Sequence, residues 1–152
     1  MADVAHLLIL AAALAAGCEL STLQVKLAFP DADDEILVHE AGDVLGFDIV
    51  IVPEHRGSIK LTVARLCDVR FAGLASDRQG GDCYREALAD DDAETIAHEI
   101  GHALGLRHVP TPAGTHPFER NLMSDLGHGH RLTDEQRDTL AEEVAWMATW
   151  CR

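Results

Sequence analysis

The residues best suited to chemistry lie in one stretch, positions 98–108, which reads His-Glu-Ile-Gly-His-Ala-Leu-Gly-Leu-Arg-His. On an α-helix, His98 and His102 are one turn apart on the same face, so they can bind one metal ion together. Gly105 can adopt the left-handed conformation that ends a helix and turns the chain back, bringing His108 to the same ion. A catalytic zinc ion takes three protein ligands and keeps a fourth position open, which matches this count. Glu99, beside the first ligand, is placed to take a proton from zinc-activated water.

The spacing works only if this stretch begins as a helix, and its other face supports that prediction. Four apolar residues lie roughly opposite His98 and His102 and can pack against a sheet: Ile96, Ile100, Ala103 and Leu104. Asp91 or Asp92 would cap the helix and place negative charge at its positive end. The alternative is a surface helix with chance histidines, but an eleven-residue pattern is far more specific than a bare His-Glu-x-x-His.

The pattern HExxHxxGxxH resembles the signature of the metzincin clan of zinc endopeptidases, in particular its small bacterial matrixin-like members. Members of this clan follow the motif with a Met-turn, and Asn121-Leu122-Met123-Ser124 matches it, with Met123 fifteen positions after His108. The resemblance covers residues 94–140 and implies that Met123 forms an apolar floor beneath the zinc ion. It also implies an α+β, metzincin-like zincin fold. Such a fold has a mixed sheet of about five strands, an active-site helix and a C-terminal helix.

Five segments upstream of the motif have the character of strands: 22–29, 47–52, 59–66, 69–75 and 83–88. In the first of them, Leu23, Val25, Leu27 and Phe29 would share one face. The short apolar run 47–52 suits a buried strand. Residues 33–45 fit either a helix or a strand, and the resemblance favours a long helix there.

The segment 71–75 corresponds to the edge strand above the matrixin cleft, which binds the substrate backbone as an added antiparallel strand. The resemblance therefore implies Gly73, Leu74 and Ala75 as substrate-binding residues. An edge strand without this role is the alternative.

The C-terminal segment reads as a capped amphipathic helix. Thr133-Asp134-Glu135-Gln136 is a capping box before a helix that runs to about Trp150, with Leu140, Val144 and Met147 as its apolar stripe. Before it, His128 and His130 flank a glycine. A loop with solvated histidines is favoured there over a second metal site.

Composition limits the class of protein. A chain of 152 residues with 47% hydrophobic content predicts one domain with a real core, which we place at 18–152 and expect to be a monomer. The net charge of −14, from 26 acidic and 12 basic residues, opposes nucleic-acid binding, because that binding depends on basic side chains that neutralise phosphates.

The N-terminus predicts export. Leu7–Ala16 is too short to span a bilayer but suits the apolar region of a signal peptide, here 1–17. The ending before Cys18 resembles a bacterial lipobox, which implies a lipid on Cys18 as the one membrane contact of a cell-envelope protein. Ala15 stands where leucine is usual, and no Lys or Arg precedes the apolar run. A plain signal peptide of a secreted or periplasmic protein, or an N-terminal core helix, are therefore the alternatives.

Three further cysteines bear on an exported protein. Cys67, Cys83 and Cys151 could form a disulfide after export, and Cys67 and Cys83 bracket the expected edge strand. The spacing alone leaves the pairing open.

The leading functional hypothesis is a zinc endopeptidase acting on a peptide or protein substrate, with Glu99 as general base. Asp125 stands where some metzincins place a tyrosine that assists the oxyanion, and we find no cysteine-switch motif for latency. The first alternative is a metal-dependent endoribonuclease, because a bacterial family of these enzymes shares the three-histidine spacing but lacks the glutamate. The second is a non-catalytic zinc-binding envelope protein.

Overall fold

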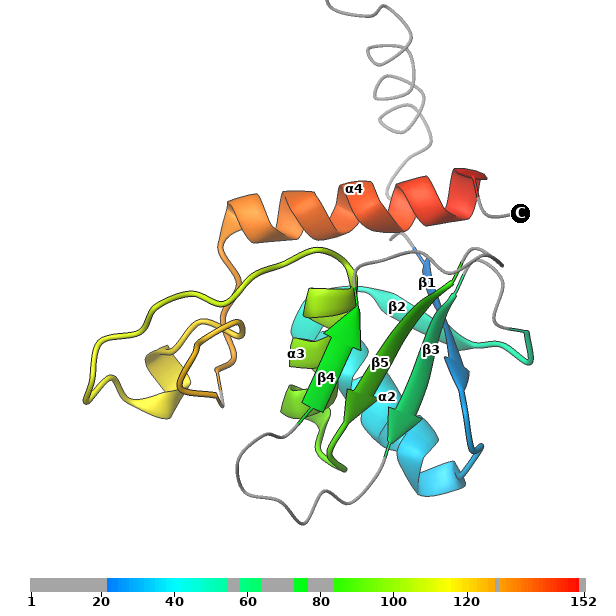
Figure 1. Cartoon of the computed structure of the whole chain (residues 1–152), viewed down its shortest axis with the longest axis horizontal. Coiled ribbons are helices and arrows are strands. Elements are labelled where there is room, and N and C mark those ends of the chain that lie inside the picture. The colour runs from blue at the N-terminus through cyan, green and yellow to red at the C-terminus, as the bar shows by residue number, and fades with distance from the viewer. Residues whose placement is uncertain (1–21, 55–57, 64–72, 77–83, 128, 151–152) are drawn as a thin grey trace, which may run out of the picture.

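The computed structural model describes residues 22–54, 58–63, 73–76, 84–127 and 129–150. Its elements are, in order, β1 (Thr22–Leu27), α2 (Ala32–Leu45), β2 (Asp48–Ile51), β3 (Ile59–Val63), β4 (Gly73–Ser76), β5 (Arg85–Ala89), α3 (Ala93–Ala103), the 3-10 helix η1 (Pro117–Glu119) and α4 (Asp134–Trp150) (Figure 1). The expected α+β class is confirmed. The helix expected at 33–45 and the two expected around 98–103 and 134–150 are all present.

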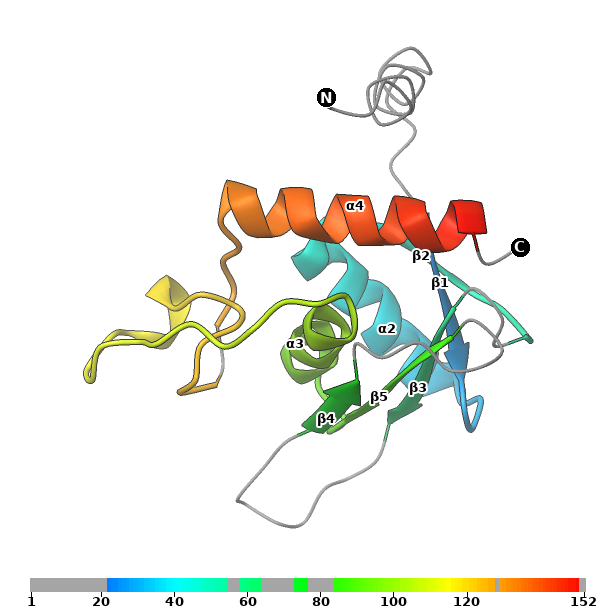
Figure 2. The same ribbon diagram turned by 45° about the horizontal axis from the view of Figure 1, so that its top comes forward.

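The strands form one sheet in the order β2-β1-β3-β5-β4. β1 runs parallel to β2 and β3, and β3 runs parallel to β5, whereas β4 is antiparallel to β5 at one edge of the described sheet. Helices α2 and α3 pack against each other beside the sheet, and α4 crosses one end of this unit in both views (Figures 1 and 2). The active-site helix predicted from the sequence is therefore α3, which contacts both β5 and the edge strand β4.

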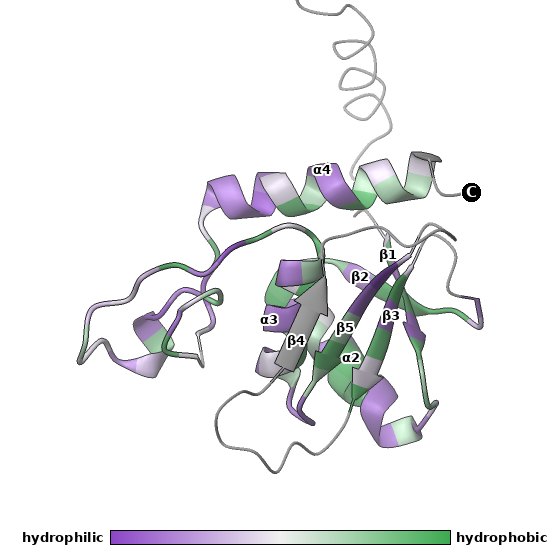
Figure 3. Cartoon of the chain, viewed as in Figure 1, coloured by the Kyte–Doolittle hydropathy of each residue, from purple (hydrophilic) through white to green (hydrophobic). Residues whose placement is uncertain are grey.

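Alternation along the strands explains why one face of the sheet carries the helices. On β1, the alternate residues Leu23, Val25 and Leu27 are buried. On the opposite face of the sheet, Lys60 of β3 and Glu86 of β5 are accessible to solvent and form an ion pair of 3.7 Å. Helix α4 shows alternating hydrophilic and hydrophobic bands, as expected of a helix with one apolar stripe (Figure 3). Its predicted stripe is confirmed, because Leu140, Val144 and Met147 are buried.

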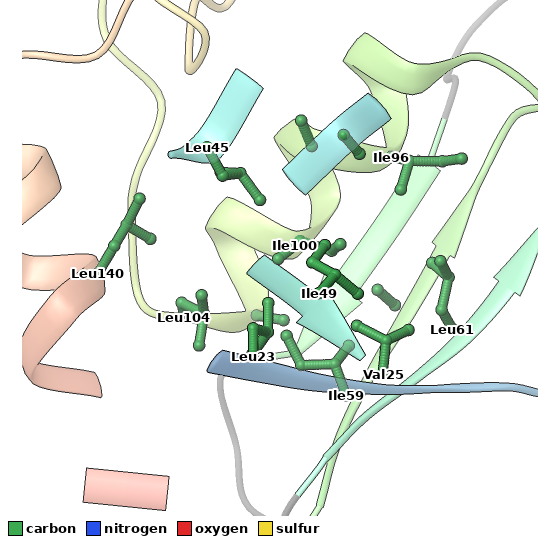
Figure 4. Close-up of a cluster of buried hydrophobic side chains, with 14 of the residues drawn as sticks. Leu23, Val25, Leu45, Ile49, Ile59, Leu61, Ile96, Ile100, Leu104 and Leu140 are labelled. Atoms are coloured by element: carbon green, nitrogen blue, oxygen red, sulfur yellow. The ribbon is translucent and has the colours of Figure 1, made fainter. Parts of the chain in front are cut away.

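One continuous core joins the sheet to the three α-helices (Figure 4). The core side chains labelled in Figure 4 come from the sheet and from all three α-helices: Leu23, Val25, Ile49, Ile59, Leu61, Leu45, Ile96, Ile100, Leu104 and Leu140. The predicted apolar face of α3 is confirmed, since Ile96, Ile100, Ala103 and Leu104 are fully buried. Burying that face orients the opposite side of α3 away from the core, and this side carries His98 and His102.

Two details of the strand predictions were wrong. Phe29 does not share the buried face of β1 and is 75% exposed, because β1 ends at Leu27 and Asp31 caps α2 immediately afterwards, accepting a 2.9 Å hydrogen bond from the Asp33 N–H. The segment 47–52 is not a fully buried strand either. Its strand β2 lies at the other edge of the described sheet, so Ile49 is buried but Val50 is 46% exposed.

Several predictions fall on residues outside the described ranges. They concern the signal peptide 1–17, the lipid on Cys18, the first histidine of the pair, His128, and the cysteines Cys67, Cys83 and Cys151. Among the helices of the described ranges, none has the length and apolar character needed to cross a bilayer.

A buried arginine, which the sequence did not single out, links three elements. The Arg85 guanidinium on β5 donates a 2.9 Å hydrogen bond to the Ala103 carbonyl at the end of α3 and a 2.7 Å ion-pair hydrogen bond to Glu143 on α4. It also lies 6.0 Å from the Trp146 ring. A cation at the C-terminal end of α3 is favourable because the helix dipole and the unpaired carbonyls are negative there.

We expect Arg85→Leu to lower the free energy of unfolding by about 2–3 kcal/mol, because the Ala103 carbonyl loses a charged donor in a buried setting. Glu143→Gln should lower it by less than about 1 kcal/mol, since the Glu143 side chain is 36% exposed and water can replace the ion pair. Urea unfolding of both variants measures these values. Equal losses would show that the ion pair, and not the contact with the end of α3, is what matters.

Candidate metal centre

Helix α3 begins and ends where the motif requires. The Asp92 side chain caps its first turn by accepting a 2.8 Å hydrogen bond from the Thr95 N–H, so of the two candidate caps it is Asp92 that serves. At the other end Gly105 has a φ of +92°. Its N–H donates a 2.9 Å hydrogen bond to the His102 carbonyl, and the Leu106 N–H donates one of 2.9 Å to the Gly101 carbonyl. This pair of bonds is a Schellman motif, and it reverses the chain direction just after the second histidine.

The reversal brings three imidazole nitrogens together. The Nε2 atom of His98 lies 3.0 Å from Nε2 of His102 and 3.2 Å from Nε2 of His108, and the remaining pair is 3.0 Å apart. In a tetrahedral site with metal–nitrogen bonds of about 2.0–2.1 Å, neighbouring ligand nitrogens lie roughly 3.3 Å apart. These three histidines therefore lie close enough to hold one metal ion, and they form the one such cluster among the described residues.

The other ring nitrogens show that the cluster is chemically suited to a metal ion. Nδ1 of His98 lies 2.7 Å from the Leu122 carbonyl oxygen, and Nδ1 of His102 lies 2.8 Å from the Leu106 carbonyl oxygen. A carbonyl oxygen only accepts hydrogen bonds, so both Nδ1 atoms carry the proton and both Nε2 atoms present a lone pair. Facing lone pairs at 3.0 Å repel one another unless a cation lies between them, so the residues fit a metal ion.

Burial reinforces this protonation state at the first ligand. Desolvation of the ring lowers the pKa of His98, the neighbouring His102 and His108 lower it further, and the hydrogen bond to Leu122 opposes them. The neutral imidazole that a metal ion needs is thereby favoured.

Glu99 is buried beside the ligands, with 6% of its surface exposed. Desolvation raises the pKa of its carboxyl to about 7. A carboxylate with this pKa can both accept and release a proton near neutral pH, which is the property that a general acid–base group requires.

Met123 is fully buried and packs against α3. Its Sδ atom would lie 2.8 Å from a Cβ added to Gly101, so the thioether occupies the space that a side chain at position 101 would need. The sequence indicated Met123 but not Gly101, whose lack of a side chain is what allows the Met123 thioether to approach α3. The Met123 carbonyl also accepts a 2.7 Å hydrogen bond from the Val109 N–H, which links Met123 to the residue after His108.

The remaining predicted residues lie on β4 and in the segment before α4. Gly73, Leu74 and Ala75 belong to the edge strand β4, paired with Ala89, Leu88 and Ala87 of β5. His130 is not simply solvated: its Nδ1 lies 3.3 Å from the Glu94 carboxylate on α3, and its ring stacks on Phe118. No metal-binding group that includes His130 is found in the described ranges.

The contact between Met123 and Gly101 can be tested with a double-mutant cycle. Gly101→Ala should lower the free energy of unfolding by about 1–3 kcal/mol because the new methyl group meets the Met123 thioether. In a Met123→Ala background the same change should cost less by roughly 1 kcal/mol or more, since the space is then free. Thermal or urea unfolding of the four metal-free proteins gives the coupling. Strict additivity would mean that the thioether does not limit position 101.

Comparison of the chain with known protein families and with curated proteins found no match. The candidate metal centre therefore rests on the convergence of its own side chains. The metzincin resemblance rests on the motif and the Met-turn segment.

Proposed function

We propose that this protein is a zinc-dependent endopeptidase of metzincin-like fold. The observation that carries the proposal is the convergence of three imidazole Nε2 atoms within 3.0–3.2 Å of one another, with Glu99 next to the first of them. Three neutral histidines with an open fourth position are the ligand set of catalytic zinc, whereas structural zinc sites are usually closed by four protein ligands.

His98, His102 and His108 would hold the zinc ion, and their Nδ1–H···O=C hydrogen bonds would keep the first two rings oriented. When bound, zinc supplies a Lewis acid that polarises the scissile carbonyl and lowers the pKa of a water molecule. The choice of zinc over other divalent ions rests on the all-imidazole ligand set, which suits zinc better than it suits magnesium or calcium.

Glu99 would act as the general base and then as the general acid. It takes a proton from the water that attacks the peptide carbonyl carbon, and it delivers that proton to the amine nitrogen as the C–N bond breaks. Its position one residue after His98 suits this role, because the side chain leaves the helix about 100° around from the first ligand and does not have to bind the metal itself.

The edge strand β4 supports an extended peptide as the substrate. β4 packs against α3 and pairs with a described strand on one side only, so its outer backbone groups can add a peptide in antiparallel fashion. Gly73, Leu74 and Ala75 would supply these backbone contacts. The same arrangement, four parallel strands bordered by one antiparallel strand next to the metal-binding helix, supports the metzincin-like assignment.

The endoribonuclease alternative has less support. A net charge of −14 repels a polyanionic substrate, and a general-base glutamate after the first histidine is absent from that family's motif. The apolar N-terminal run supports export to the cell envelope, with or without a lipid on Cys18, and that location also favours a peptide substrate.

His108→Ala tests the metal centre. Removing the third ligand should lower Zn²⁺ affinity by more than the roughly 10–100-fold that is typical when only the hydrogen-bond partner of a ligand is lost. Competition with a chromogenic chelator measures the affinity. His39→Ala, an exposed histidine on α2, is the matched control and should bind Zn²⁺ like the wild type. Unchanged affinity in His108→Ala would remove it from the ligand set.

Glu99→Gln tests the chemistry, because it keeps the shape of the side chain and removes its basicity. The variant should bind zinc as the wild type does and lose about 10²- to 10⁴-fold in peptide hydrolysis. Glu142→Gln on the exposed face of α4 is the control and should keep full activity. Cleavage is measured on a mixed peptide library and on RNA, with and without chelator. A wild-type protein that cuts RNA but no peptide would favour the endoribonuclease over the endopeptidase. A wild-type protein that cuts neither would favour a non-catalytic zinc protein.

A further inference from the structure

We propose that Asn121 is a positioning residue for the first metal ligand, acting through the Leu122 carbonyl and held in place by Gln136 on α4. The inference rests on the metal centre of the proposed function but not on the peptidase reaction. The group that orients the His98 ring is the backbone carbonyl of Leu122. The direction of this carbonyl is set by the orientation of its peptide unit and not by the Leu122 side chain.

The peptide unit between Leu122 and Met123 explains how a side chain can control that carbonyl. A peptide unit is planar and rigid, so its C=O and N–H groups turn together. At one end the Leu122 oxygen lies 2.7 Å from Nδ1 of His98, and at the other end the Met123 N–H donates a 2.9 Å hydrogen bond to Oδ1 of Asn121. Holding the N–H end therefore fixes the direction in which the carbonyl meets the imidazole.

Asn121 is itself held by a reciprocal pair of amides. Its Nδ2 donates a 2.7 Å hydrogen bond to Oε1 of Gln136, and Nε2 of Gln136 donates a 3.1 Å bond back to Oδ1 of Asn121. Gln136 is in turn fixed by the capping box of α4: its Oε1 also accepts from the Thr133 N–H over 2.9 Å, and its own N–H donates to Oγ1 of Thr133 over 3.2 Å.

The backbone on the other side of the turn completes the clamp. The Leu122 N–H donates a 2.6 Å hydrogen bond to the Arg131 carbonyl. Gly129 approaches the Asn121 carbonyl so closely that a Cβ at position 129 would collide with it. The segment 121–123 is thus held by the start of α4 and the residues before it. This series of hydrogen bonds ends at His98, the first of the proposed metal ligands.

A purely structural link between the turn and α4 would stabilise the fold without affecting the metal ion. A positioning role of Asn121 predicts that its loss changes the metal affinity and the ligand field of the bound ion, whereas a structural role predicts that both stay the same. Partners that orient a metal-bound histidine typically change metal affinity by about 10–100-fold when they are lost. Visible absorption of the Co²⁺-substituted protein reports the orientation of the ligands independently of any catalytic assay.

The experiment measures Zn²⁺ affinity by chelator competition and the Co²⁺ spectrum for wild type, Asn121→Ala, Asn121→Asp and Thr133→Ala. Asn121→Ala should lose about 10–100-fold in Zn²⁺ affinity and show shifted cobalt bands. Asn121→Asp keeps an acceptor for the Met123 N–H and should restore a spectrum close to that of wild type. Thr133→Ala is the matched control, because it removes the Oγ1 acceptor of the same helix cap but keeps the backbone N–H of residue 133 that donates to Oε1 of Gln136. The amide pair therefore stays in place, and the variant should lower only thermal stability.

Unchanged affinity and an unchanged cobalt spectrum in Asn121→Ala would overturn the inference while leaving the proposed function intact. If Asn121→Ala does not fold, Gln136→Ala carries the test, since it keeps the Met123 N–H···Oδ1 bond but releases the side chain of Asn121. Its Zn²⁺ affinity should fall below that of Thr133→Ala, and equal affinities would contradict the proposal. A wild-type protein that binds neither Zn²⁺ nor Co²⁺ would remove the proposed function as well.

Discussion

The turn that ends α3 determines whether the three histidines meet, and the candidate centre depends on it. With Gly105 in the left-handed region, the N–H groups of Gly105 and Leu106 satisfy two carbonyls at the end of the helix, and the chain doubles back so that His108 returns to the face that carries His98 and His102. The same turn sets the Leu106 carbonyl against Nδ1 of His102. One backbone reversal therefore both brings His108 to the other two histidines and fixes the tautomer of His102.

The tautomer of His98 depends on contacts between residues that are distant in sequence. The Leu122 carbonyl that meets His98 belongs to a turn that also carries Met123, and Met123 fills the space left by Gly101 on α3. The carbonyl and the thioether thus contact α3 from neighbouring residues. A shift of this turn would alter the orientation of the first ligand and the packing beneath the centre together, which explains why so many hydrogen bonds converge on positions 121–123.

Burial of α3 is what gives the centre a rigid support. The apolar side chains of α3 are fully buried against the sheet and the neighbouring helices. The guanidinium of Arg85, on β5, donates a hydrogen bond to the carbonyl of Ala103, the last residue of α3. Because β5 also pairs with β4, the helix that carries the ligands and the edge strand proposed to hold a peptide share one neighbour. Their relative position is set by sheet hydrogen bonds and by side-chain packing, and not by a loop.

The local elements followed from the sequence because short-range rules decide them. The capping residues Asp92 and Thr133, the apolar stripe of α3 and the glycine that ends it depend on neighbours within a few positions, and the predictions for them are confirmed. The histidine spacing predicted the ligand cluster for the same reason. Local patterns were insufficient at Phe29, which alternation placed on the buried face, and at Val50, which lies in an apolar run predicted to be buried. Their exposure is decided by where a strand leaves the sheet and which strand lies at its edge.

Only the tertiary structure decided which groups support the centre. The long-range contacts of Arg85, of Gly101 and between Asn121 and Gln136 have no local signature, because each joins elements that lie many residues apart. Their roles depend on how α4 and the turn at 121–123 pack against α3. Residue types and spacing could thus determine which side chains are able to bind a metal ion, but long-range packing determined how those side chains are oriented, since hydrogen bonds to backbone carbonyls leave no trace in the sequence.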